Sequence, residues 1–156
     1  MQYTQIDLAP KKGSDTIGMI GGDDTFDEAN AWIWDGSAWG SYTQITASMQ
    51  SPNYRQVALA WESSSGNLLA VAALATPSDI ISKEYTTTWS GTSTFTCSSG
   101  KGQDQTFWLS LKANPLASAN DMVLGLVQDN YDLNTCYWTG SAWATWVQHD
   151  IDYDAV

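Results

Sequence analysis

A hexapeptide that occurs twice constrains the fold of this chain more than any other feature of its sequence. Trp34-Asp35-Gly36-Ser37-Ala38-Trp39 returns 104 residues later as Trp138-Thr139-Gly140-Ser141-Ala142-Trp143. A weaker copy, Trp89-Ser90-Gly91-Thr92-Ser93-Thr94-Phe95, lies midway between the two. Self-similarity at a period of about 50 residues is typical of repeat architectures. The chain of 156 residues therefore divides into units of about 1–53, 54–104 and 105–156.

Each unit predicts four short strands. In the third unit we expect strands at 107–111, 122–127, 134–138 and 143–147. The apolar second strand is expected to be buried on both faces. Glycine between the third and fourth strands suits a turn, because glycine tolerates a positive φ. The predicted turn residues are Trp34, Gly36, Trp39, Trp89, Gly91, Trp138, Gly140 and Trp143.

Four strands in each repeat favour an all-β fold of three antiparallel, propeller-like units in a single domain. No segment has a sustained 3.6-residue period, so almost no helix is expected. The alternative fold is a β-sandwich of about twelve strands. Propellers usually have 4 to 8 blades, so three units leave at least one apolar face without a neighbour. We therefore expect head-to-tail self-association, as a closed ring of two chains or an open filament.

Two segments resemble the halves of a known tandem repeat. They are residues 55–67 (RQVALAWESSSGN) and the stretch from 120–126 (NDMVLGL) to Trp143. The resemblance is to Trp-x-Gly-x-x-Trp-type, propeller-like repeats of long secreted or cell-surface proteins of bacteria and archaea. It implies an extracellular or cell-surface module without catalytic residues. We expect a structural role in a fibre, sheath or surface layer, and the alternative is a carbohydrate-binding, lectin-like propeller or adhesin.

The charge and composition exclude several classes of function. The chain has 17 acidic and 6 basic residues and a net charge of −11, whereas a nucleic-acid-binding face needs clustered Lys and Arg. No apolar run approaches the ~20 residues that cross a bilayer, so we expect no membrane insertion. Catalytic triads, zinc sites and phosphate clamps draw mostly on His and Arg. Since the chain has only His149 and Arg55 of these types, we expect no enzyme activity and no cofactor.

Acidic residues gather in three places that could bind Ca²⁺ through oxygen ligands. The alternative is that they form solvated turns, which Asp favours. The groups are Asp23, Asp24, Asp27 and Glu28; Asp129, Asn130 and Asp132; and Asp150, Asp152 and Asp154.

Four further side chains carry specific expectations. Cys97 and Cys136 are 39 residues apart, and adjacent units would bring them within reach of a disulfide, with two buried thiols as the alternative. Trp146 and Tyr131 are the candidates for sugar-stacking platforms, because their local alternation leaves them outside the core.

Overall fold

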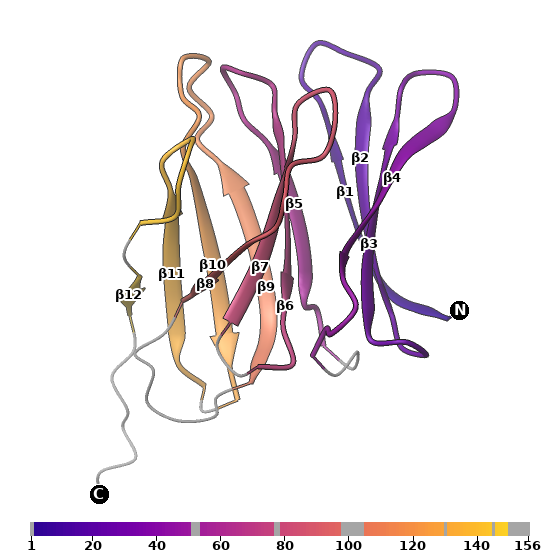
Figure 1. Ribbon diagram of the computed structural model, residues 1–156. Helices are drawn as coiled ribbons and strands as arrows, with labels where there is room; N and C mark the ends of the chain where they lie inside the picture. Colours follow the sequence, from indigo (N-terminus) through magenta and orange to yellow (C-terminus); the bar gives the residue numbers. More distant parts are fainter. Residues whose placement is uncertain are drawn as a thin grey trace, which may run out of the picture.

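The computed structural model describes residues 2–50, 54–76, 79–97, 105–129, 131–144 and 146–149. These residues form three four-stranded antiparallel sheets, which lie side by side in chain order (Figure 1). The described residues contain no helix, and so none that could span a membrane.

Every sheet keeps its strands in the order of the chain. The first sheet contains β1 (Tyr3–Pro10), β2 (Ile17–Asp23), β3 (Glu28–Trp34) and β4 (Trp39–Thr46). The second contains β5 (Val57–Trp61), β6 (Leu68–Ala73), β7 (Asp79–Tyr85) and β8 (Ser93–Thr96). The third contains β9 (Thr106–Ala113), β10 (Met122–Gln128), β11 (Leu133–Trp138) and β12 (Val147–Gln148).

The first strands of neighbouring sheets pack side by side. β5 contacts both β1 and β9, and the Leu109 N–H donates to the Arg55 carbonyl at 2.7 Å. The facing side chains of the sheets form two separate core layers. One layer lies between the first and second sheets and includes Ile20, Ile33 and Leu68. The other lies between the second and third sheets and includes Leu69, Leu109 and Leu124.

The burial of the second strands follows from the number of neighbouring sheets. β6 is buried at every position, because its sheet has a neighbour on each face. We expected the same of 122–127, and this prediction was wrong. Met122 and Leu124 of β10 are 1% and 0% exposed, but Val123 between them is 44% exposed. The third sheet has a described neighbour on one face only, so β10 alternates.

The fourth strand of the third sheet is shorter than the predicted 143–147. β12 spans Val147–Gln148, and Trp143 forms only an isolated bridge with Trp138. β12 is the edge strand of its sheet and pairs with β11 at only two positions, Asn134 with Gln148 and Thr135 with Val147.

Tryptophan indoles connect each sheet to the one before it. Four indole N–H groups donate across a boundary between sheets, and in every case the donor belongs to the later sheet. The bonds run from Trp61 to the Ala9 carbonyl (2.8 Å), from Trp89 to the Ser41 carbonyl (2.5 Å), from Trp138 to Glu62 Oε1 (2.7 Å) and from Trp143 to Ser82 Oγ (3.1 Å).

Candidate functional site

The repeated turns of the first and third sheets have the same geometry. Gly36 and Gly140 have φ angles of +101° and +91°, which favour glycine. The Asp35 carboxylate accepts hydrogen bonds from the backbone N–H groups of Ala38 (2.9 Å) and Ser37 (2.8 Å). These bonds, with that of Ala38 contributing most, lower the pKa of Asp35 below its ordinary value of 3.8. Both turns join the third strand to the fourth, so these residues have a structural role.

The middle copy is displaced from its predicted place. Trp89 was aligned with Trp34, but Tyr85 occupies that position and forms a bridge with Trp89, as Trp138 does with Trp143. The turn lies at Thr86–Thr88, where the Thr86 N–H donates to the Thr88 carbonyl, and Gly91 falls beyond it. The alignment failed because this turn has one residue fewer and no glycine.

The two cysteines form a disulfide between the second and third sheets. Cys97 follows β8, Cys136 lies on β11, and their sulfur atoms are 2.06 Å apart. Both residues are buried, at 0% and 2% exposure, so the bridge lies within a core layer.

The acidic group of the first sheet organises a turn. Asp23 is fully buried, and its Oδ1 accepts hydrogen bonds from the N–H groups of Thr25 (2.7 Å) and Phe26 (3.1 Å). Within the described ranges, no three His, Cys, Asp or Glu side chains come together as a metal site. Asn130, Asp150, Asp152 and Asp154 lie outside the described residues.

The expected stacking platforms differ in exposure. Trp146 is half-buried and packs against the core between the second and third sheets, so the prediction that it lies outside the core was wrong. Tyr131 is 78% exposed and has a φ of +66°, at the turn between β10 and β11. His149 is exposed, and its Nε2 lies 2.7 Å from Thr135 Oγ1.

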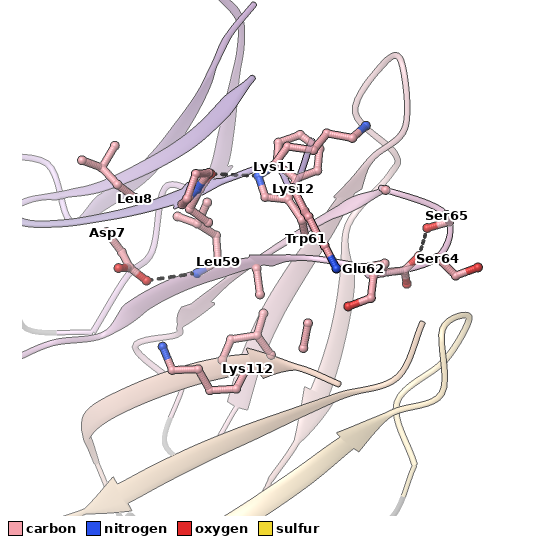
Figure 2. A pocket seen from close by; sticks show the side chains of 17 residues that line it. Asp7, Leu8, Lys11, Lys12, Leu59, Trp61, Glu62, Ser64, Ser65 and Lys112 are labelled. Carbon is pink, nitrogen blue, oxygen red and sulfur yellow. Dashed lines mark hydrogen bonds between the residues drawn. The ribbon is translucent and has the colours of Figure 1, made fainter. Parts of the chain in front are cut away.

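A pocket of about 460 Å³ lies where β1, β5 and β9 meet the turn after β5. Leu8, Leu59 and Leu111 supply apolar wall, and the Ser63–Ser65 segment lines another part of the pocket. Figure 2 labels Leu8, Leu59, Ser64 and Ser65 among the lining residues. This volume falls in the range of small-molecule sites, which combine apolar walls with a few polar groups.

Positive charge is concentrated at this pocket. Lys11, Lys12 and Lys112 line it, which is three of the six basic residues in a chain of net charge −11. Figure 2 shows Lys11 and Lys12 on one side of β5 and Lys112 on the other. Lys11 Nζ lies 4.9 Å from the centre of the Trp61 ring. None of the three ammonium groups forms an ion pair with a described carboxylate.

The carboxylates at the pocket already have partners. Asp7 pairs with Arg55 at 3.1 Å and accepts from the Leu59 N–H at 3.3 Å. Glu62 is 3% exposed and accepts from the Trp138 indole and the Ser65 hydroxyl. Ser63 and Ser65 already donate to the Asn114 carbonyl and to Glu62, so the donors left for a ligand are mainly the three ammonium groups and the Ser64 hydroxyl.

The three lysines were not predicted as site residues, although the sequence carries a signal for them. Lys11 and Lys12 follow the first strand of the first unit, and Lys112 comes directly after the expected first strand of the third, 107–111. Three of the few basic residues thus fall at equivalent strand ends, which the fold brings to one place.

Solved structures resemble this fold, although no protein-family model and no curated protein match the sequence. One is a fungal lectin from Aleuria aurantia, described as a six-bladed β-propeller with a novel fucose recognition mode. It superposes with a TM-score of 0.61 at 13% identity, over 89% of this chain and 42% of the lectin. A mutant of that lectin with α-methyl-L-fucoside gives 0.61 at 12% identity, again over 89% and 42%.

The three sheets are propeller-like blades. This confirms the predicted fold class, and three separate sheets exclude the two-sheet sandwich. The chain spans about two fifths of the length of the lectins it matches. At this identity the likeness establishes the fold alone.

Proposed function

We propose that this chain is a carbohydrate-binding propeller module and that its ligand is an acidic saccharide. The pocket at β1, β5 and β9 carries the proposal, because it joins apolar walls, the Ser64 hydroxyl and three lysines without carboxylate partners. A sugar presents apolar C–H groups and hydroxyls, and a uronic or sialic acid adds a carboxylate that lysine can bind. The likeness to fucose-binding lectins supports a glycan as the class of ligand.

A binding role agrees with the state of the titratable groups. Asp7 and Glu62 are held by internal partners, so neither is placed to act as an acid or base toward a ligand. His149 bonds to Thr135, away from the residues that line the pocket. We therefore propose a lectin rather than an enzyme.

An extracellular or cell-surface location is part of the same proposal. Disulfides persist in oxidising compartments, and the Cys97–Cys136 bridge fits such a location. The role in a fibre, sheath or surface layer stays a prediction from the sequence.

The test is a glycan array followed by calorimetric titration of the best ligands. We expect binding to uronate- or sialate-bearing glycans that weakens at least about tenfold in Lys12→Gln and in Lys112→Gln, and weakens with added salt. Lys83→Gln is the matched control, since Lys83 bonds to Thr43 and Gln44 away from the pocket.

Two results would contradict parts of this proposal. If the protein bound neutral glycans and both lysine variants bound them equally well, the proposals of an acidic ligand and of this pocket would be wrong. The proposal of a lectin would stand. Absence of binding to any glycan at millimolar concentration would overturn the lectin itself.

A further inference from the structure

The register of the strands makes positions on the three sheets directly comparable. The second and third strands pair Ile17 with Trp34 in the first sheet, Leu68 with Tyr85 in the second and Met122 with Trp138 in the third. Counting from these pairs identifies equivalent residues on each sheet. We call the face that a sheet turns toward the preceding sheet its leading face, and the opposite face its trailing face.

Equivalent residues of the leading faces differ sharply in exposure. In the second sheet, Val57 and Leu59 are 0% and 4% exposed, because they pack on the first sheet. Leu109 and Leu111 of the third sheet are 0% and 2% exposed against the second. The equivalent residues of the first sheet are Ile6 and Leu8, which are 60% and 53% exposed.

The same face of the first sheet lacks the indole contacts of the other two. Trp89 and Trp143 donate to Ser41 and Ser82 of the preceding sheets. Trp39 is equivalent to both, is 45% exposed, and makes no indole hydrogen bond to any described residue. The leading face of the first sheet thus has the apolar side chains and the indole donor that, in the other two sheets, contact the preceding sheet. No described sheet covers this face.

The trailing face of the third sheet also has exposed apolar side chains and no described sheet against it. Val123, Leu133 and Tyr137 are 44%, 43% and 41% exposed. The equivalents of Val123 and Leu133 in the second sheet, Leu69 and Ile80, are 1% and 0% exposed, and the equivalent of Tyr137 is the half-buried Glu84. Lys112 is the only charged side chain that the described strands of the third sheet place on this face.

We propose that two copies of this chain close on each other into a six-sheet ring, with the leading face of each first sheet on the trailing face of the other's third sheet. The boundaries within the chain are the template. At the boundary between the first and second sheets, Gly18 lies against Leu59 and Leu68. Val123 is the equivalent of Gly18, so in the ring Val123 of one copy lies against Leu8 and Ile17 of the other. Ser82 accepts from Trp143, and the equivalent hydroxyl, that of Thr135, accepts from the Trp39 indole of the other copy.

A second copy fits better than an unrelated partner for two reasons. Each copy offers one face of each kind, and both are built from residues that already form such boundaries in this chain. The matched lectins have six blades and this chain covers 42% of one, so two copies supply the number of sheets that closes the ring. The inference does not rest on glycan binding.

The test is the mass of the particle by sedimentation velocity and light scattering in about 0.5 M NaCl, which screens the charge of −11 on each chain. At micromolar concentration we expect about 34 kDa, twice the 17.0 kDa of one chain. A mass of one chain, or an open-ended series of larger masses, would overturn the ring.

Variants at the seam test the proposed contact. Ile17→Lys and Val123→Glu, which alter opposite sides of the seam and do not line the pocket, should each weaken pairing on the order of 100-fold. The double variant should regain part of this loss, because the new charges face each other. Leu116→Glu, at a loop residue 64% exposed, is the control and should leave the mass unchanged. If both single variants kept the mass of two chains, the proposed seam would be wrong.

Discussion

The indole N–H of Trp138 donates a 2.7 Å hydrogen bond to the buried carboxylate of Glu62, across the boundary between the second and third sheets. The two residues are 76 positions apart in the chain. Ser65 donates to the other carboxylate oxygen, so the bond also fixes the turn that borders the pocket. One buried acceptor thus connects a boundary between sheets to the candidate site.

We expect Glu62→Ala to lower the free energy of unfolding by about 1–3 kcal/mol, because the Trp138 N–H is left buried without an acceptor. Glu62→Gln keeps one carbonyl oxygen and should cost less. Urea unfolding with a Trp138→Phe double-mutant cycle isolates the contact. If Glu62→Ala lowers the free energy of unfolding equally in the wild type and in the Trp138→Phe variant, the hydrogen bond contributes nothing.

The disulfide should make a large contribution to stability. Its loop spans 39 residues, for which the loss of chain entropy on cross-linking corresponds to roughly 4 kcal/mol. We expect Cys97→Ala with Cys136→Ala to lower the melting temperature by about 10 °C relative to the oxidised chain. Intact mass and alkylation in denaturant without reductant check the bond itself. Two alkylated thiols in the denatured, unreduced protein would contradict the disulfide.

Gly18 is a test of the close approach between the first and second sheets. A Cβ at this position would lie 2.6 Å from Leu68 Cδ2 and 2.8 Å from Leu59 Cδ1. Gly18→Ala should therefore destabilise the chain by about 1–3 kcal/mol through overpacking. Gly40→Ala is the matched control, because a Cβ there meets no atom within 4 Å. Similar stabilities for the two variants would mean that the sheets are not packed as described.

Asp35 should make the first turn sensitive to acid. Its folded-state pKa is lowered by hydrogen bonds, so its contribution to stability is present above its ordinary value of 3.8 and is lost as the pH falls through the lowered pKa. Asp35→Asn should flatten the stability profile below about pH 4. The measurement is urea unfolding between about pH 5 and pH 2, with exposed Asp24 as the site of a control Asp→Asn change. Parallel profiles for wild type and Asp35→Asn would refute the role of this carboxylate.

Local pattern was enough to predict the strands but not the number of their neighbours. The alternation around Cys136 separates Cys136 and Trp138 on one face from Thr135 and Tyr137 on the other, and in the structure the first pair is the buried one. Whether Val123 is buried depends on a sheet beyond it, and no local pattern reports that. The displaced Trp89 shows a related limit, since residue spacing identifies a turn only when both turns have the same length.

The pocket could not be derived from any one segment. Lys11, Trp61 and Lys112 come from three units about 50 residues apart, and only the register of β1, β5 and β9 brings them together. Trp146 was misplaced for the same reason, because it packs on a core layer that another sheet completes.

The Cys97–Cys136 bridge makes the three sheets unequal under mechanical load. It ties the second sheet to the third, and these are the only two cysteines, so no such covalent tie joins the first sheet to the second. A force that draws the sheets apart therefore meets a disulfide at one boundary, and packing, hydrogen bonds and the Asp7–Arg55 ion pair at the other. The first sheet should separate from the second at low force, while the second and third sheets stay linked until the disulfide is reduced.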